Sequence, residues 1–553
     1  MGRAFGIGWQ WLGIVRSIGP SLEQEALRRV PTSWPALGLL ALFLVLTRMP
    51  ALLHPKAIDD EQVYAVVAHE MLQGGQPYRD AIERKPPLLF ALYKWIFIAA
   101  GARNWMALHV TTIVWTGLTM AALYRVASGL FGAQTGVWAA FLYGLFAAWG
   151  DYRNLALNGE LLLNLPVVVA FALVIGGPRT TLRPELAIAG SLIGAACLLK
   201  QPAAIAVIPI GLYLLRQDYR SPRHLRWSHA VLHVAVFAVA FTLPLVVAGF
   251  VLWRRGLLEQ AVYWAVLDHR LPLKVLVRRT LANAPRSCLF FAVSTLPLLV
   301  AAATSIFRGR RRERYWSDHP AEFAALWMFL LVSIIGVGSN GQFDFHYFLL
   351  LLPWLALLGA PFFVVDVDQL SERLPMLRPR QLAAWLALTA VVFLVVDTIG
   401  LWRQRAVSVA ANYVAAHTAI DDRIFVWGQG DRQTGMYLDA DRRPASRHIA
   451  TFSLTGHFSG RVRPDAWETL QQDFSAHPPR YIIDTDGMGA VAMHPIASYP
   501  VMQTYLARYY REVYRAADGI VYERVGLSSR PPSASLESTR PKVKCCHRGS
   551  GVA

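Results

Sequence analysis

Three adjacent carboxylates, Asp59, Asp60 and Glu61, stand between two apolar stretches near the start of the chain. Like charges at this spacing repel one another and raise some of their pKa values, which suits either proton abstraction or cation binding. The same residues could instead form the acidic first turn of a helix that begins near Gln62, where the helix dipole stabilises negative charge. The sequence leaves both interpretations open, and Asp60 and Glu61 are candidate catalytic residues.

A second acidic site follows a later apolar run, where Asp151 precedes Arg153 and Glu160. Ionisable residues at the edge of a membrane span are costly unless they are paired or used in function. Asp151 is therefore a further catalytic candidate, although it could simply pair with Arg153 or cap the next helix. Carboxylate oxygens also suit a divalent metal, and Asp60 and Asp151 are the residues that would bind one if the protein uses it.

Three basic residues near the ends of apolar runs suit the binding of an anion. Lys85 precedes two prolines, Lys200 stands between two apolar runs, and His346 opens another. A lone lysine at such a place can also snorkel toward the membrane surface, and a lone histidine is often only interfacial. Together with the carboxylates, however, these side chains predict a site for a phosphate-bearing lipid, in which cations neutralise a leaving phosphate.

The elements that must position these residues are apolar. Of 553 residues, 55% are hydrophobic and 16% are charged, and the mean hydropathy is +0.35. A soluble protein would carry about 25% charged residues, so the composition predicts a polytopic membrane protein and excludes a disordered chain or a purely soluble enzyme. The net charge of +18 is attributed to basic loops, and no nucleic acid is expected as a partner.

About eleven apolar runs are long enough to be membrane-spanning helices, which need about 20 residues each. We expect the stretch 87–101 to lie along the membrane surface as an interfacial helix. The predicted spans cover roughly residues 35–53, 105–127, 133–149, 160–177, 186–199, 203–215, 230–253, 288–307, 321–338, 346–365 and 381–401.

The short loops between these runs orient the chain in the plasma (inner) membrane. One set of loops, 178–185, 216–229, 308–320 and 366–380, carries 14 basic residues, whereas the opposite set carries two. Basic loops stay in the cytoplasm, so the N-terminus is expected there and the candidate site on the extracytoplasmic side. The long loops 54–86 and 254–287 then also face outward.

The loop 254–287 breaks the charge rule with seven cations, among them Arg270 and Lys274. They could contact anionic lipid headgroups, or they could bind the phosphate of a lipid-linked substrate as part of a loop that covers the site. Leu257, Leu258 and Val262 to Trp264 have helical spacing, so an interfacial helix could carry His269 and Arg270 to the site.

The chain is predicted to have four parts: a cytoplasmic N-terminus (1–34), a transmembrane catalytic domain (35–402), an extracytoplasmic α/β domain (403–525) and a disordered tail (526–553). In the third part, residues 423–428 and 480–484 are typical of strands, and 465–475 and 498–511 of helices. The tail is rich in Ser, Pro and Arg. No internal repeat of the kind found in transporters is evident.

The order of these motifs resembles a known family. Asp60, Glu61, Tyr64 and Ala65, then Met71, Leu72 and Gly75, then Lys85 to Pro87 are similar to the opening signature of the GT-C membrane glycosyltransferases. The nearest branch is the protein-mannosyltransferase/aminoarabinose-transferase-like group, which includes the RgtA/B/C/D-like enzymes. The turn Leu199 to Pro202 and the run from His346 to Pro353 are similar too, so the resemblance covers roughly residues 35–365. Arg84 departs from the group's common Glu.

The resemblance implies an all-α GT-C domain that transfers a sugar from a polyprenyl-phosphate donor to an envelope lipid, glycan or protein, as in lipopolysaccharide biosynthesis. It implies that Asp60 is the base, with Glu61 beside it and Asp151 as second acid. Lys85 and Lys200 match cations near the carrier phosphate, and no nucleotide-sugar is needed. Some relatives use a divalent metal, which this sequence permits without requiring.

Two other classes remain open on the sequence. A secondary transporter or lipid flippase would also place charges near a membrane pathway, although its acidic residues would be expected near the midplane. A binding protein without activity, which recognises glycan through residues 403–525, is the third interpretation.

Overall fold

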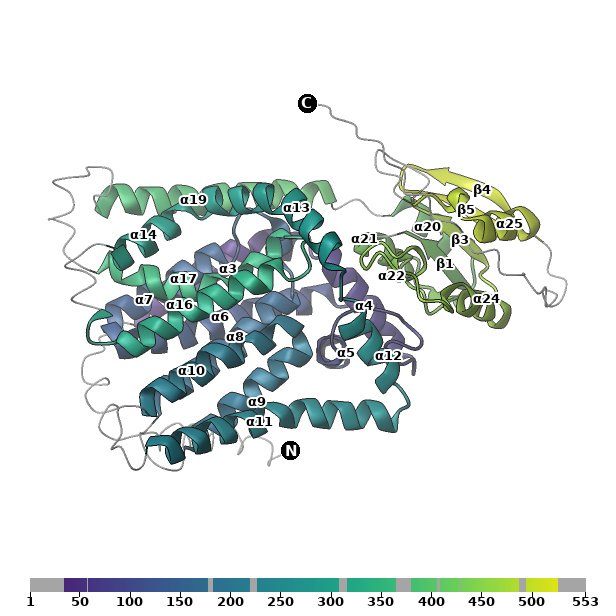
Figure 1. The fold of residues 1–553 in the computed structure, drawn as a ribbon. Helices are drawn as coiled ribbons and strands as arrows, with labels where there is room; N and C mark the ends of the chain where they lie inside the picture. The colour runs from purple at the N-terminus through teal and green to yellow at the C-terminus, as the bar shows by residue number, and fades with distance from the viewer. Residues whose placement is uncertain are drawn as a thin grey trace, which may run out of the picture.

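The computed structural model describes residues 34–56, 58–177, 183–218, 226–307, 316–364, 379–404, 408–428, 430–486 and 494–525. These residues form a large helical bundle with a smaller α/β domain at one end of it (Figure 1). Residues 1–33, most of the four arginine-rich loops and the tail 526–553 lie outside the described residues. The predictions made for those segments therefore stay predictions.

Each apolar run predicted as a span is helical in the structure. The corresponding elements are α3 (Trp34–Leu53), α6 (Trp105–Phe131), α7 (Ala133–Phe146), α8 (Gly159–Gly176), α9 (Pro184–Leu199), η2 (Gln201–Ala206) with α10 (Val207–Asp218), α11 (Arg226–Arg254), α13 (Leu273–Ser294) with α14 (Leu296–Phe307), α16 (Pro320–Gly338), η4 (Phe345–Leu350) with α17 (Leu352–Gly359) and η5 (Ala360–Phe363), and α19 (Pro379–Gln404). The bundle is thus all-α, and the protein is a multi-pass membrane protein.

Several of these spans are short or broken. Among the described residues, five helices are long and apolar enough to cross a membrane alone, or six if α13 and α14, bent by 80°, form one span. Pro202 lies at the start of η2 and Pro353 at the start of α17. Proline cannot donate the helical hydrogen bond and restricts the residue before it, so these runs change from one helical form to another there.

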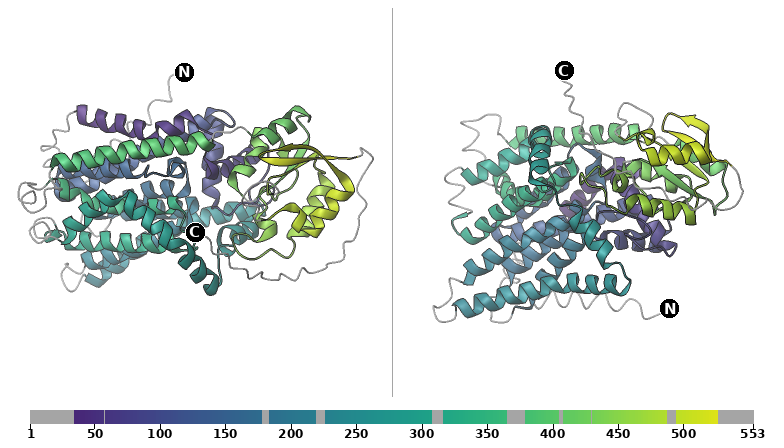
Figure 2. Two further views of the ribbon diagram at one scale, coloured as in Figure 1. Left: turned by 90° about the horizontal axis from the view of Figure 1, so that it is seen from above. Right: turned by 45° about the vertical axis from the view of Figure 1, so that its right-hand side comes forward.

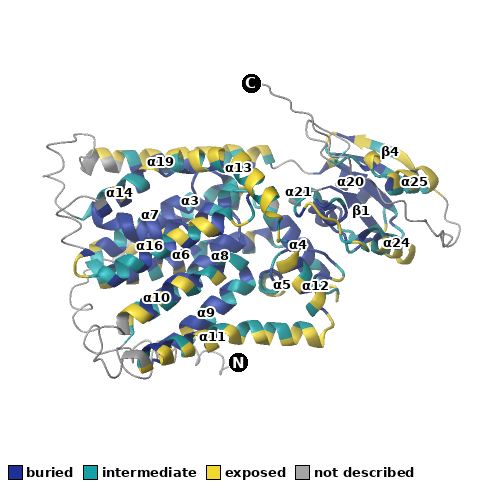
Figure 3. Ribbon diagram, in the orientation of Figure 1, coloured by how far each residue is buried: buried dark blue, intermediate teal, exposed yellow. Residues whose placement is uncertain are grey.

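Small residues let some helices approach closely. Gly190 and Gly194 on α9 face α11, where a side chain on either glycine would collide with the carbonyl oxygens of Phe237 and Phe241. Small residues four apart are a common way of packing helices within a membrane. On the outside of the bundle, α11, α13 and α19 expose apolar side chains such as Val239, Leu281 and Leu388 (Figure 3), which suits contact with lipid.

The C-terminal domain contains a five-stranded mixed sheet in the order β2-β1-β3-β5-β4. β1 (Arg423–Trp427) is parallel to β2 (Arg443–Pro444) and to β3 (Tyr481–Asp484). β5 (Gly519–Arg524) is antiparallel to β3 and pairs with β4 (Tyr510–Ala516) in a hairpin. The helices are α20 (Val409–Ala416), α21 (Asp431–Thr434), α22 (Met436–Asp439), α23 (Phe452–Thr455), α24 (Ala466–Ala476), η7 (Ile496–Ser498) and α25 (Pro500–Tyr509).

One hydrophobic cluster contains residues of both parts. Two further helices, α4 (Asp59–Leu72) and α5 (Pro87–Ala100), pack with α/β-domain residues such as Tyr437 and Ile483. The helix α12 (Leu258–Val262) and the π-helix η3 (Tyr263–Leu267) join them through Trp264, whose ring contacts Phe452. Figure 2 shows these segments between the bundle and the sheet. The long loops predicted between spans are therefore folded elements that hold the α/β domain in place.

Candidate active site

A cavity of about 620 Å³ opens where the bundle meets the α/β domain. Its walls come from segments that are far apart in the sequence, and many of the side chains that line it are charged. The lining includes Asp60, Glu83, Arg84, Lys85, Arg153, Glu160, Lys200, Gln201, His269, Asn340, Gln342, Asp344, His346 and Tyr347, with Gly430 and Phe458 from the α/β domain. A cavity of this size is typical of small-molecule binding sites, but its lining is richer in charged side chains than most, which suits a charged ligand.

Asp60 belongs to a line of interacting side chains along one wall. Its Oδ2 lies 3.4 Å from His346 Nε2, and the same nitrogen lies 3.8 Å from Glu160 Oε1. Glu160 Oε1 in turn forms an ion pair of 2.8 Å with Lys200 Nζ. Both carboxylates are at helix starts: Asp60 is in the first turn of α4 and Glu160 is in the first turn of α8. The helix dipole favours negative charge at these positions.

Two polar atoms on this wall are buried without a hydrogen-bond partner in the described part of the chain. They are Glu160 Oε2 and His346 Nδ1, and their side chains are 2% and 8% exposed. A buried polar atom is costly when it lacks a partner. Because both residues line the cavity, a bound substrate or water could supply the missing partners.

Two lysines face the same space. Lys85 Nζ lies 3.4 Å from Glu83 Oε1. Lys200 is the extended residue between the end of α9 and the start of η2. Burial lowers the pKa of Lys200, and the charge of Lys85 lowers it further, whereas Glu160 acts in the opposite direction. The negative charge of an anion bound between the two lysines would raise the pKa of Lys200 and so act against both lowering effects.

Glu61 and Asp151, the other predicted catalytic acids, do not line this cavity. Glu61 is fully buried, its Oε1 accepts the Leu157 N–H at 2.6 Å, and its Oε2 lies 3.6 Å from His109. Burial raises its pKa. Asp151 accepts two hydrogen bonds from Arg153, at 3.0 and 2.7 Å, and caps the short helix η1 (Tyr152–Leu155). Both side chains are held by contacts outside the cavity lining, and Asp151 is connected to the cavity through Arg153. Their predicted catalytic role stays a prediction.

Comparison with known proteins agrees with this architecture. Residues 84–247 match the family described as dolichyl-phosphate-mannose-protein mannosyltransferase. ArnT from Cupriavidus metallidurans bound to undecaprenyl phosphate has a TM-score of 0.55 at 15% identity, covering 89% of this chain and 98% of ArnT. The apo form of that protein has a TM-score of 0.57 at 14% identity, and the match covers 88% of this chain and 98% of ArnT. The chain has the GT-C fold. Among curated proteins, none matches the chain in sequence.

The GT-C fold confirms the family resemblance that the sequence motifs indicated. The cavity also contains residues outside those motifs. Arg270 and Lys274, predicted to bind phosphate, are exposed and do not line the cavity. Their neighbour His269 does line it, and so does Arg84, which departs from the family pattern. Arg84 Nε forms a 2.7 Å ion pair with Asp268.

Arg84 connects three segments at the cavity mouth. Its guanidinium lies over the Phe458 ring of the α/β domain at 5.0 Å, and its carbonyl oxygen accepts a hydrogen bond from His269 Nε2 at 3.0 Å. Burial and the Arg84 charge lower the pKa of His269 to about 3, so this imidazole is neutral at physiological pH. His269 therefore positions the loop and does not act as a cation for a phosphate.

A divalent metal does not fit the residues that the structure describes. No three His, Cys, Asp or Glu side chains among them have the grouping of a metal site. Of the predicted pair, Asp151 is hydrogen-bonded to the Arg153 guanidinium and Asp60 lies against His346. Glu160, the other acid near Asp60, already pairs with Lys200.

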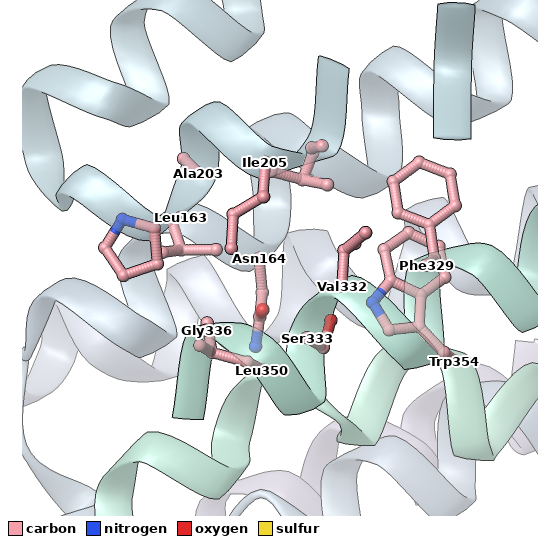
Figure 4. Close-up of a pocket in the computed structure, with 13 residues that line it drawn as sticks. Leu163, Asn164, Ala203, Ile205, Phe329, Val332, Ser333, Gly336, Leu350 and Trp354 are labelled. Atoms are coloured by element: carbon pink, nitrogen blue, oxygen red, sulfur yellow. The ribbon is translucent and has the colours of Figure 1, made fainter. Parts of the chain in front are cut away.

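A small, mostly apolar pocket lies between α8, η2, α16 and α17 (Figure 4). It shares four lining residues with the cavity, namely Pro202, Ile205, Gly336 and Leu350. Its other walls are mostly apolar, with Phe329 and Trp354 stacked at 4.0 Å. The polar site thus adjoins apolar surface inside the bundle.

Proposed function

We propose that this protein is a membrane glycosyltransferase that moves a sugar from a polyprenyl-phosphate donor to an acceptor hydroxyl. One observation carries the proposal: a single cavity brings together a carboxylate beside a histidine, a buried Glu160–Lys200 ion pair and a second lysine. This combination supplies a base for a hydroxyl and cations for a phosphate.

Asp60 is the proposed base. It removes the proton from the acceptor hydroxyl as the oxygen attacks the anomeric carbon of the donor sugar. The bond between that carbon and the phosphate oxygen breaks, polyprenyl phosphate leaves with the electron pair, and the configuration inverts. His346, 3.4 Å from Asp60, orients the carboxylate. Correct positioning of the two reactants supplies a large part of the rate enhancement.

Lys85 and Lys200 are proposed to bind the donor phosphate. Both line the cavity, and their mutual repulsion falls when a phosphate lies between them. The bound phosphate gains negative charge as it leaves, so the same cations stabilise the transition state more than the ground state.

Two further findings support the proposal. ArnT, which shares the fold, was solved with undecaprenyl phosphate, a carrier of the class proposed here. The charge pattern of the short loops favours a position of the site at the extracytoplasmic face of the plasma membrane, where a lipid-linked donor would replace nucleotide-sugars. The acceptor is proposed to be an envelope lipid, glycan or protein, and the sugar a hexose or pentose.

The proposal is tested by comparing cells with and without the gene. Mass spectrometry of envelope glycans and of lipid-linked sugars should show one sugar missing from an acceptor and its polyprenyl-phosphate form accumulating when the gene is deleted. Unchanged acceptors would contradict transfer. If the lipid-linked sugar accumulated only on the cytoplasmic face, the protein would be a flippase.

A further inference from the structure

The α/β domain presents a particular edge of its sheet to the cavity. β1 and β3 are parallel neighbours in the order β2-β1-β3, and the chain leaves β1 toward β2 but returns on the other side to form β3. The carboxyl ends of such a pair, where the strand order reverses, are the usual ligand site of an open α/β sheet. Gly430, just after β1, lines the cavity, so this edge faces the proposed active site.

The backbone at this edge is closely packed. The Thr485 N–H and hydroxyl both donate to the Trp427 carbonyl oxygen at 2.9 Å, joining the ends of β1 and β3. A side chain at Gly428 would collide with the Thr485 hydroxyl. The carboxyl ends of β1 and β3 are therefore held together as one rigid edge, which we call the platform. Side chains from the surrounding segments pack near it.

Five half-buried rings form a continuous strip along this platform, which we call the aromatic strip. It starts at Phe458, which lines the cavity, and continues to His457, with ring centroids 4.9 Å apart. The next steps are His494 at 5.4 Å, Tyr499 at 6.3 Å and Trp467 at 5.7 Å. Trp467 is at the start of α24 and Tyr499 precedes α25, so both helix starts bring a ring to this edge.

Hydrogen bonds connect the polar groups of the aromatic strip. His494 Nδ1 lies 2.8 Å from the Tyr499 hydroxyl, and its Nε2 lies 3.3 Å from His457 Nδ1. If Tyr499 donates to His494 and His494 donates to His457, both contacts are satisfied by neutral rings. Burial lowers the pKa values of both histidines, which favours the neutral forms. Rings that combine apolar faces with hydrogen-bonding edges match the two kinds of surface on a sugar, its C–H face and its hydroxyls.

We propose that the aromatic strip is an acceptor subsite for a saccharide, along which successive sugar rings stack from Trp467 toward Phe458 and the cavity. The proposal rests on the proposed glycosyltransferase function and specifies its acceptor: the group that receives the sugar is part of a carbohydrate. The continuity of the strip with the cavity, and its position at the switch point of the sheet, distinguish it from aromatic residues elsewhere in the domain.

The experiment uses the full chain in lipid nanodiscs and measures saturation-transfer NMR with maltohexaose and with N-acetylchitohexaose. At least one probe should bind saturably, and Trp467→Leu with Tyr499→Leu should weaken that binding about tenfold, the loss expected for stacked rings. Trp467→Phe keeps a ring and should restore most of the binding. The matched control is Tyr509→Leu, because Tyr509 lies at the opposite end of α25 and packs against Tyr505.

Undecaprenyl phosphate binding, measured on the same samples, separates this proposal from the proposed function. If the double variant binds undecaprenyl phosphate as the wild type does but loses the oligosaccharide, the subsite is supported. If no oligosaccharide binds saturably, or if the double variant and Tyr509→Leu bind it equally, the proposal is overturned while the donor site stands. A wild type that does not bind undecaprenyl phosphate would instead contradict the glycosyltransferase function. Near-ultraviolet circular dichroism checks that each variant is folded.

Discussion

His346 Nε2 lies 3.4 Å from Asp60 Oδ2 and 3.8 Å from Glu160 Oε1, so one imidazole nitrogen stands between two carboxylates. The nitrogen can donate its hydrogen to only one oxygen at a time. This places the proposed base in contact with the Glu160–Lys200 ion pair, and through it with the proposed phosphate site. The proposed base and Lys200, one of the two proposed phosphate-binding cations, are thus parts of one network.

Glu61 should be dispensable for turnover although it neighbours the proposed base. Its Oε1 accepts the Leu157 N–H, and the side chain of Glu61→Gln keeps an oxygen at that place. We expect Glu61→Gln to keep turnover within about threefold of wild type, because the buried side chain is not in the cavity. Glu61→Ala should instead lower the melting temperature, since it leaves the N–H without a partner. A large loss of turnover in a well-folded Glu61→Gln protein would return the catalytic role to Glu61.

Asp151 should act through Arg153. The two side chains form a bidentate pair, and only Arg153 lines the cavity. We expect Asp151→Asn to raise the donor KM and to lower turnover by less than about tenfold, well short of the loss of a general base. Steady-state kinetics with varied donor measure both values, and Arg153→Gln should have the same effect. A loss as large as that of a missing base in Asp151→Asn alone would contradict this assignment.

Lys200 should make donor binding sensitive to alkaline pH. Burial lowers its pKa below the ordinary value of 10.5, so it loses its charge at a pH where exposed lysines keep theirs. As the pH rises through this lowered pKa, one phosphate-binding cation disappears and the donor KM should rise. Arginine stays protonated throughout this range, so Lys200→Arg should flatten the dependence. Identical pH profiles for the two proteins would rule out Lys200 as the titrating group.

Arg84 should hold the cavity mouth together. Its ion pair with Asp268 is largely buried, with the two side chains 11% and 5% exposed. Arg84→Gln leaves the Asp268 charge buried without its partner, which typically costs about 3–5 kcal/mol. We expect a fall in apparent melting temperature and faster proteolysis between the bundle and the α/β domain. Arg84→Gln with Asp268→Asn should recover much of the stability; if it does not, the charge is not the cause.

Much of the fold could be predicted because membrane helices have strong sequence signals. Apolar runs gave the helices of the bundle, and the strands β1 and β3 and the helices α24 and α25 followed from their periodicity. The hairpin of β4 and β5 was not predicted. Most β4 residues are exposed or only half-buried, so the sequence of β4 lacks the apolar alternation by which a strand is predicted. The strand is recognised only from its pairing with β5.

The residues of the cavity could be predicted only where their position within their own segment indicates a role. Asp60, Lys85, Lys200 and His346 stand at the ends of apolar runs, and all four line the cavity. Phe458 and Gly430 could not be found, because they reach the cavity only when the α/β domain docks on α4 and η3. Arg270 and Lys274 were predicted from their charge and, for Arg270, from the helical spacing of the preceding residues. Neither signal tells which side of a loop faces a cavity.

The most direct test of the central claim is the turnover of a lipid-linked sugar by the purified protein. The full chain in nanodiscs is incubated with acceptor membranes and with undecaprenyl phosphate that carries a hexose, a pentose or an amino-pentose, and the release of undecaprenyl phosphate is measured. We expect release with at least one donor, and a loss of about 10²–10⁴-fold in Asp60→Asn, the usual effect of removing a general base. No release with any donor, or equal release by wild type and a folded Asp60→Asn variant, would contradict the account.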